Sequence, residues 1–228
     1  MKRLFLSAVA AVALSVAPAV AADMPVKGPI YKAPAYAAYN WTGFYLGING
    51  GGAWGNTTWN DPAAGNGSWK TSGGLVGGTA GYNWQAPGSA FVFGVEGDLD
   101  FGNVTGTGNN PDCAVLVNCQ TRTTWLGTVR GRGGYSWDRW LAFVTGGAAF
   151  GNIKASASGT PEESANRTGW TLGGGVEYAF AGPWSAKVEY LYVDLGNFNC
   201  GAAGCGVPSP TSVNHRMNVV RGGINYRF

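Results

Sequence analysis

Two carboxylates that stand two residues apart, Glu96 and Asp98, are the residues best placed by type and spacing to do chemistry. A pair of neighbouring carboxylates can supply a general acid and a general base. Residues at i and i+2 of a β-strand lie on one face, so both would point the same way. Arg130 and Arg132 repeat this spacing in the next strand-like stretch. Arginines beside the carboxylates would keep both ionised, which favours ion pairs over catalysis.

The single histidine, His215, is the other candidate for catalysis, because a nucleophilic triad needs a positioned base. No motif places a serine or an aspartate with it. The sequence therefore predicts an exposed histidine near the outer end of the last strand. No catalytic residue is assigned and no enzymatic activity is expected; a lipid-modifying barrel enzyme is kept as an alternative hypothesis.

Four cysteines form two closely spaced pairs, Cys113 with Cys119 and Cys200 with Cys205. Both pairs lie in polar, loop-like segments without histidines at metal-ligand spacing, so we expect neither a metal site nor a cofactor. Cysteines of a secreted chain are typically oxidised to disulfides. Four cysteines allow three pairings.

The N-terminus has the pattern of a targeting sequence, and residues 1–21 are predicted to be a secretory signal peptide. Lys2 and Arg3 precede an apolar stretch, and Ala-Val-Ala at 19–21 fits cleavage before Ala22, although cleavage after Ala22 fits as well. Residues 22–40 contain three prolines and are predicted to be an extended periplasmic lead-in to a barrel domain at 41–228. The formal net charge of +3 includes Lys2 and Arg3, so the mature chain is near neutral and no nucleic-acid partner is expected.

The C-terminal stretch shows the pattern of the elements that must position these residues. Ile224, Tyr226 and Phe228 alternate with polar or small residues, as in a strand with one apolar face. Seven further stretches are predicted to be strands, six of them with the same period of two. The predicted strands are 41–54, 74–84, 90–101, 123–137, 140–150, 168–180, 184–195 and about 215–228. Both faces of 140–150 are apolar or small, so its orientation stays open.

Composition and connection lengths indicate the architecture. Only 12% of the residues are charged, against roughly 25% in soluble domains, and 39 are glycine. Connections alternate between long and short, and aromatic residues gather in two bands near the strand ends. Outer-membrane barrels have these features, with short periplasmic turns and long external loops. We predict an all-β fold, an eight-stranded antiparallel up-and-down transmembrane β-barrel with both termini in the periplasm and four long loops outside. A soluble β-sandwich is the alternative.

The same alternation sorts the charges onto the inner face. A lipid-facing Arg or Lys would cost roughly 2–4 kcal/mol at the bilayer midplane, and eight strands leave an interior just wide enough for side chains to fill. We therefore predict an internal network of ion pairs that fills the lumen. Its members are Glu96, Asp98, Arg130, Arg132, Glu177, Lys187, Glu189 and Arg221.

Several short motifs resemble those of a known family. They include Asn-Trp-Thr-Gly-Phe-Tyr-Leu-Gly at 40–47, Phe-Gly-Val-Glu-Gly-Asp at 93–98, Val-Arg-Gly-Arg-Gly-Gly-Tyr at 129–135 and Gly-Gly-Gly-Val-Glu-Tyr at 173–178. The chain is similar to small outer-membrane proteins of alphaproteobacteria, the Omp25/Omp31-like porin family within the OmpA-type group of eight-stranded barrels. The resemblance covers nearly all of the mature chain. It implies an outer-membrane location, no agreed catalytic residues, and a C-terminal assembly signal at Ile224, Tyr226 and Phe228.

The sequence as a whole predicts a monomeric outer-membrane barrel with a structural or surface-interaction role. Its expected partners are outer-membrane lipid and lipopolysaccharide, the barrel-assembly machinery, and an external ligand at the loops. A narrow porin-like channel for small solutes is the first alternative, although eight strands leave no wide aqueous channel. A receptor or adhesin that binds through its loops is another.

The cysteine spacing predicts two local disulfides, Cys113–Cys119 and Cys200–Cys205, on the outer face. Local closure costs less chain entropy than pairing between loops, and each small ring should add only about 2–3 kcal/mol. Reduction should loosen the loops and leave the strands folded. Peptide mapping without reductant tests the pairing, and a cross-linked peptide that joins one pair to the other would contradict it.

Overall fold

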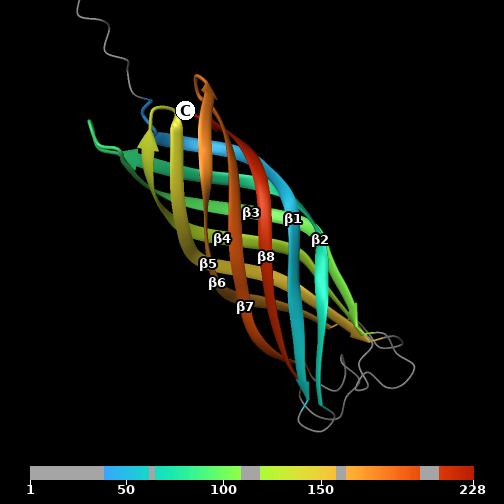
Figure 1. Cartoon of the computed structure of the whole chain (residues 1–228). Helices are drawn as coiled ribbons and strands as arrows, with labels where there is room; N and C mark the ends of the chain where they lie inside the picture. Colours follow the sequence, from blue (N-terminus) through green and yellow to red (C-terminus); the bar gives the residue numbers. More distant parts are fainter. Residues whose placement is uncertain (1–38, 62–64, 109–118, 158–162, 201–210) are drawn as a thin grey trace, which may run out of the picture. The chain divides into compact units, whose positions relative to one another are not determined.

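Eight β-strands make up most of the chain that the structure, a computed structural model, describes: residues 39–61, 65–108, 119–157, 163–200 and 211–228. Figure 1 shows the strands following one another around a barrel. They are β1 (Gly43–Asp61), β2 (Gly65–Gln85), β3 (Phe91–Gly108), β4 (Cys119–Trp137), β5 (Trp140–Ala157), β6 (Glu163–Ala181), β7 (Trp184–Cys200) and β8 (Thr211–Arg227). No helix in these ranges is long and apolar enough to cross a membrane.

Each strand pairs antiparallel with its neighbours in the sequence, and β1 pairs with β8 to close the barrel. The predicted eight-stranded antiparallel barrel is confirmed. Closure reaches the last residue, because the Phe228 amide donates a hydrogen bond to the Phe44 carbonyl oxygen over 2.9 Å. A closed sheet has no edge, so the strands satisfy their backbone donors and acceptors without water.

The strands are longer than the sequence predicts. β1 runs to Asp61 and β2 begins at Gly65, although the hydropathy pattern predicts a polar loop over 55–73. The two strands stay in register through this region, with Asn56 opposite Lys70. An apolar face is needed only where a strand meets lipid, whereas backbone pairing has no such requirement. The hairpin therefore continues with polar side chains past the point where the apolar alternation stops.

Short turns join β2 to β3, β4 to β5 and β6 to β7 at one end of the barrel, here called the turn rim. Gly88, Asp138 and Gly182 take positive φ in these turns, of 75°, 52° and 51°. Tight hairpins require this conformation, which glycine and aspartate adopt at low cost. The opposite end of the barrel, where β1 ends beside the start of β2 and β7 ends beside the start of β8, is here called the loop rim. The C-terminal Phe228 lies at the turn rim, where β8 ends beside the start of β1.

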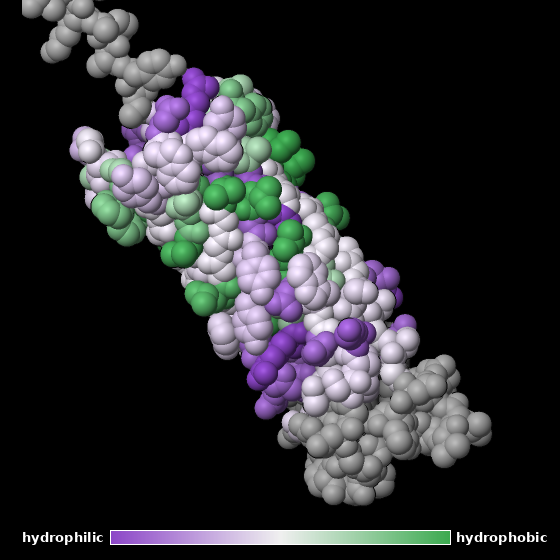
Figure 2. All heavy atoms as spheres, in the orientation of Figure 1, coloured by the Kyte–Doolittle hydropathy of each residue, from purple (hydrophilic) through white to green (hydrophobic). Residues whose placement is uncertain are grey.

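The outer surface is apolar between two bands of aromatic side chains. Near the turn rim, the Trp140 and Tyr178 rings pack with centroids 4.6 Å apart. Toward the loop rim, the Trp170 and Tyr192 centroids are 5.4 Å apart. Figure 2 shows the strongly hydrophilic residues gathered mainly toward the two ends of the face in view, with most of the hydrophobic residues between them. Aromatic girdles around an apolar band match the surface that barrels present to a bilayer.

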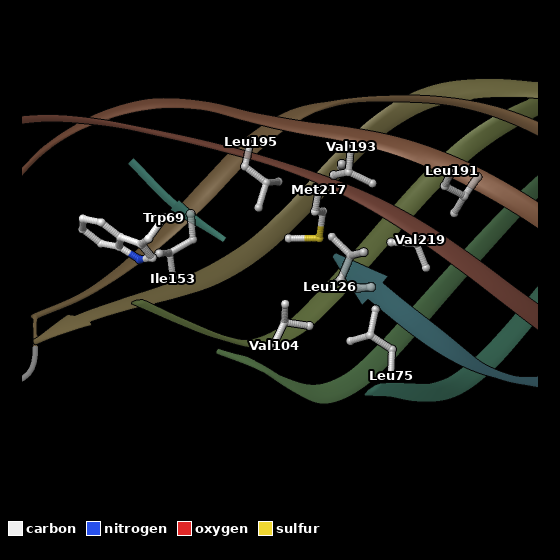
Figure 3. Packing of buried hydrophobic residues seen from close by; sticks show 12 residues of the cluster. Trp69, Leu75, Val104, Leu126, Ile153, Leu191, Val193, Leu195, Met217 and Val219 are labelled. Carbon is white, nitrogen blue, oxygen red and sulfur yellow. The ribbon is translucent and has the colours of Figure 1, made fainter. Parts of the chain in front are cut away.

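Side chains fill the interior in three layers along the barrel. The layer nearest the loop rim is apolar, and Figure 3 shows its packing. The middle layer is charged, and the layer nearest the turn rim is again apolar. The loop-rim layer consists of Ala53, Trp69, Leu75, Val104, Leu126, Ala149, Ile153, Leu191, Val193, Leu195, Met217 and Val219, and the turn-rim layer of Trp41, Val92, Leu141, Phe143 and Ala179. The sequence pattern predicts only the middle layer.

Strand β5, whose orientation the sequence leaves open, is fixed by its neighbours. Leu141 and Phe143 point inward, and Trp140 and Val144 point outward. The register sets this choice, because inward-facing Arg132 of β4 stands opposite Thr145 of β5. Directly opposed residues of paired strands lie on the same face.

The residues just before β1 close the turn rim from inside. Trp41 is 2% exposed and lies in the turn-rim layer, although the sequence predicts it as the first strand residue. Its amide donates a hydrogen bond to the Gln85 side-chain oxygen over 2.9 Å. The Tyr39 ring packs edge-on against Trp41 at 4.8 Å, and the Arg227 guanidinium lies 4.2 Å from the Tyr39 centroid. β1 therefore starts at Gly43, after Trp41 has entered the turn-rim layer.

Inward-facing glycines let neighbouring strands approach closely. A Cβ added at Gly51 would meet the Val220 carbonyl oxygen and the backbone of Arg221, and the strands would have to shift. The adjacent Gly50 shares the outward face with Ile48. A Cβ there would find its nearest neighbour, the Leu75 carbonyl oxygen, at an ordinary 3.5 Å.

These two adjacent glycines provide a matched test of the narrow interior. Gly51→Ala should lower the free energy of unfolding by about 1–3 kcal/mol through overpacking. Gly50→Ala should be neutral or stabilise by about 0.4–1 kcal/mol, because alanine restricts the unfolded chain. Urea unfolding in detergent micelles, followed by tryptophan fluorescence, measures both. Equal stability of the two variants would contradict the assigned faces.

Candidate functional site

The charged middle layer is the candidate functional site. Its side chains come from β3, β4, β6, β7 and β8 at alternate positions, so all of them point inward. Residues between them, such as Val95, Val129 and Val188, point outward and are more than half exposed. Apolar and charged residues alternate along these strands because the outer face of the barrel is apolar, whereas the inner face contacts the charged side chains of the other strands.

Arg130 lies at the centre of the layer and bridges three carboxylates. Its Nη2 is 2.5 Å from Glu96 Oε1 and 2.7 Å from Asp98 Oδ2. Its Nη1 is 3.0 Å from Glu189 Oε2, which belongs to β7. Glu96 stands directly opposite Arg130 in the β3–β4 ladder, but Glu189 does not neighbour β4. One guanidinium thus joins neighbouring strands and also crosses the lumen.

Arg221 of β8 makes a second crossing. Its Nη1 is 2.9 Å from Asp98 Oδ1, and its Nε is 2.8 Å from Glu189 Oε1 on the neighbouring strand. The same Nη1 also contacts Asp100. Asp100 is absent from the predicted network, although it continues the i, i+2 series of Glu96 and Asp98, and that signal could have identified it.

Lys187 and Arg132 complete the set of cations. Lys187 Nζ lies 2.8 Å from Glu96 Oε2 and 3.2 Å from Glu189 Oε1. Arg132 Nη2 lies 2.8 Å from Glu177 Oε2, whereas its Nη1 is 3.7 Å from Glu96. Glu177 and Lys187 are directly opposed in the β6–β7 ladder. The close partner of Glu177 is nevertheless Arg132, from a strand that is not adjacent to β6.

Neutral side chains fill the remaining positions around the ions. The Tyr45 hydroxyl donates to Glu96 Oε2 over 2.7 Å, and the Thr128 hydroxyl donates to Asp98 Oδ2 over 2.6 Å. Around Glu177 Oε1, Ser185 Oγ donates over 2.6 Å and Asn225 Nδ2 over 2.9 Å. These residues were not identified from the sequence, because Ser, Thr and Asn are common at many other positions. They satisfy acceptor sites that ion pairs alone would leave open.

Four cations and five carboxylates meet in this layer, and every one of them is at most 8% exposed. Each of the five carboxylates contacts a cation. Pairing is required, because removing an ion from water costs several kcal/mol. Apolar layers separate the site from both rims. Glu96 and Asp98 are therefore arranged to hold cations, not to meet a substrate as acid and base.

His215 is buried in the lumen, and the prediction of an exposed position is wrong. The residue is 1% exposed, and its Nδ1 lies 2.9 Å from Thr57 Oγ1. β8 begins at Thr211, so position 215 is inside the strand and shares the inward face with Met217. In the described part of the chain, no group of three or more His, Cys, Asp or Glu side chains could hold a metal ion.

The predicted disulfides cannot be placed within the described residues. Cys113 and Cys205 lie outside them, and Cys119 and Cys200 are the first residue of β4 and the last of β7, with side chains that are not described. The pairing stays a prediction.

Ile224, Tyr226 and Phe228 lie on the outer surface of β8 and at the chain end. The Tyr226 and Phe228 rings are 5.1 Å apart, edge to face. The three side chains form an apolar row that reaches the turn rim. Their role as an assembly signal stays a prediction.

A closed barrel of eight strands, with an apolar outer belt, aromatic girdles and an ion-paired interior, defines a small transmembrane β-barrel of the outer-membrane type. The family model described as an outer membrane protein beta-barrel domain matches residues 6–228. The chain belongs to this family.

Three related proteins can be aligned with this chain over about two thirds or more of their length. The 31 kDa outer-membrane immunogenic protein of Brucella melitensis is 37% identical to this chain over 252 residues, which cover all of both chains. The 25 kDa outer-membrane immunogenic protein of Brucella abortus is 30% identical over 93% of this chain and 89% of its own. The 22 kDa outer membrane protein of Rhizobium leguminosarum is 35% identical over 72% and 68%. The resemblance drawn from the motifs is confirmed, and the chain is an outer-membrane protein.

The Arg132–Glu177 pair gives the sharpest test of the ion-paired layer. Arg132→Met should lower the free energy of unfolding by about 3–5 kcal/mol, because Glu177 loses its cation in a buried site. Arg132→Met combined with Glu177→Met should recover much of that loss. Urea unfolding in micelles measures both changes. The control is Arg139→Met at an exposed turn, which should stay within about 0.5 kcal/mol of wild type. Equal losses in the single and double variants would contradict the pairing.

Proposed function

We propose that this protein is a closed, non-conducting outer-membrane barrel that serves as a structural element and a surface scaffold. Both termini face the periplasm, and the loop rim faces the exterior. The proposal rests on one observation, the charged layer inside the barrel with an apolar layer on either side of it.

Contacts across the barrel support a closed lumen. Arg130 on β4 reaches Glu189 on β7, and Arg221 on β8 reaches Asp98 on β3, over 3.0 and 2.9 Å. An ion that entered would have to break these pairs and also wet two apolar layers. Hydrophobic constrictions are effective barriers to ions. The narrow porin-like channel therefore gains no support from the interior.

The lengths of the strands support a surface role. β1 and β2 have 19 and 21 residues, whereas about 9–11 residues of a tilted strand cross the hydrocarbon. The remainder stands beyond the aromatic band near Trp54 and Trp170. Connections held on a rigid scaffold are suited to binding, and an external ligand would bind there. The description of two relatives as outer-membrane immunogenic proteins agrees with surface exposure.

The position of the barrel in the outer membrane also suggests its lipid and protein partners. The apolar belt contacts outer-membrane lipid and lipopolysaccharide, and the row of Ile224, Tyr226 and Phe228 contacts the barrel-assembly machinery. The barrel acts as a monomer, because its strands pair with one another until the sheet closes. Enzymatic activity on lipid gains no support, because Glu96 and Asp98 are buried in ion pairs with Arg130 and His215 is hydrogen-bonded to Thr57 inside the barrel.

Planar-bilayer recording tests the closed lumen. The purified barrel should give no stepwise conductance, whereas a general porin reconstituted in the same way should give clear steps. A heat-dependent shift of the same sample in detergent gels establishes that it is folded. Steps in the wild type whose cation preference changes in Lys187→Gln would contradict the proposal and show that ions pass through the charged layer.

A further inference from the structure

The charged layer holds one carboxylate more than it holds cations. Five carboxylates meet four cations, and each of these side chains is at most 8% exposed. A buried ion costs several kcal/mol unless a counter-charge compensates it. His215, the next inward-facing ionisable side chain along β8 from Arg221, stands six residues away, or about 20 Å along the strand. The layer therefore carries one negative charge that its described side chains do not balance.

Asp100 is the carboxylate with the weakest compensation. Its Oδ2 contacts Arg221, but that cation is shared with Asp98 and Glu189. Asp98 also contacts Arg130, as Glu189 does. Among the carboxylate oxygens of the layer, Asp100 Oδ1 is the one without a hydrogen-bond partner in the part of the chain that the structure describes. The excess negative charge therefore lies mainly on Asp100.

A gap in the wall of the barrel lies beside this oxygen. Asn49 of β1, Gly77 of β2 and Asp100 of β3 form one row of the sheet, and the glycine places no side chain in the middle of the row. Asp100 Oδ1 lies over Gly77, because a Cβ added there would collide with it. Thr79, the next inward-facing residue of β2, is a diagonal neighbour of both Asn49 and Asp100.

The polar side chains around this gap are buried and incompletely bonded. Asn49 and Thr79 are each 4% exposed. The Asn49 side chain lies close to Asp100, yet neither its amide atoms nor the Thr79 hydroxyl has a hydrogen-bond partner among the described residues. Buried polar atoms without a partner are rare in proteins. Three neighbouring strands thus present an amide, a hydroxyl and a carboxylate to the lumen beside Gly77.

The surroundings enclose this group of oxygens. Asn49 and Asp100 belong to strands on either side of β2, so their backbones are about 9–10 Å apart. Their short side chains approach each other over Gly77 from opposite sides. Leu75 precedes Gly77 by two residues, and Leu126 stands opposite Asp100 in the ladder. Both leucines belong to the loop-rim layer drawn in Figure 3, so apolar side chains border the site.

We propose that Asn49, Thr79 and Asp100 form a buried site for one alkali metal cation, such as Na⁺. Carboxylate and amide oxygens are ligands that hard cations prefer. A monovalent ion balances the single excess charge, whereas a divalent ion would replace it with an excess of the opposite sign. The site does not rest on the proposed function, because an enclosed cation need not pass through the barrel.

Refolding of the full mature barrel in sodium chloride or in N-methylglucamine chloride, at equal ionic strength, tests the site. Refolding lets the cation enter before the apolar layers form. A ligand that binds only the folded state stabilises it increasingly with concentration. The urea midpoint should rise with Na⁺, with no more than one ion taken up per barrel. The organic cation is too large for the site and should give no such rise.

Two threonines of β2 provide the matched comparison. Thr79→Val removes a proposed ligand and should raise the Na⁺ concentration needed for half of the effect about tenfold, as expected for losing one polar contact to a charge. The Thr71 hydroxyl is also buried without a hydrogen-bond partner within the described ranges, but it stands six residues from Gly77. Thr71→Val should therefore respond to Na⁺ as wild type does. Asp100→Asn removes the excess charge and should abolish the response.

Crystals grown with thallium(I), which scatters anomalously and replaces alkali cations, locate the ion. One anomalous peak should lie beside Gly77, between Asn49 and Asp100. A peak elsewhere in the lumen, or equal losses in Thr71→Val and Thr79→Val, would contradict the assigned ligands. An infrared band of a protonated carboxyl that disappears in Asp100→Asn would show that a proton balances the charge instead.

The heat-dependent gel shift, measured on each variant, identifies any that fail to fold. A folded wild type whose urea midpoint is the same in both salts would overturn the cation site and leave the proposed function intact. Stepwise conductance in planar bilayers would have the opposite consequence, since it bears on the closed lumen and not on a bound ion.

Discussion

A lumen bounded by only eight strands is too narrow to stay empty and too narrow to hold large side chains at every position. The rest of the structure depends on this constraint. Where strands come closest, the inner face carries glycine, as at Gly51, where a Cβ would meet the neighbouring backbone. Where there is room, long side chains reach across, as Arg130 does to Glu189. Their charges are tolerated there, between two apolar layers, because every carboxylate contacts a cation.

Much of this arrangement could be predicted from the sequence, because a strand between two solvents has a period of two. The alternation at 224–228 identifies the last strand, and the charges at 96, 98, 130 and 132 identify the inward face. The same rule fails where both faces are apolar. Leu191, Val193 and Met217 point into the lumen, and their sequence pattern does not distinguish that lumen from lipid. The sequence does not predict the burial of His215 for a related reason. The apolar alternation of β8 is clear only near its C-terminal end, whereas the backbone pairing begins at Thr211, before His215.

The partners of individual ions could not be predicted from sequence at all. Strand order supplies the neighbours of a residue within the wall, such as Lys187 opposite Glu177. It does not supply contacts across the lumen, which depend on strand tilt and stagger. Glu177 instead holds Arg132, and Lys187 reaches Glu96 on β3. Each carboxylate is positioned by strands from different parts of the wall, so the layer ties the wall together from inside.

The bulge in β4 follows from the same constraint on the interior. Without it, Arg122 would share the inward face with Leu126 and lie in the apolar layer near the loop rim. That layer is built mainly from apolar side chains, so a cation there would lose its hydration at a cost of several kcal/mol. The register shift at Thr124 turns Arg122 outward and brings Thr123 inward instead. The free-energy cost of burying the Arg122 charge is thereby avoided, and a positive charge lies on the outer surface opposite Lys154. A lumen that accepts only paired ions thus contributes to the charge pattern that the barrel presents to its membrane.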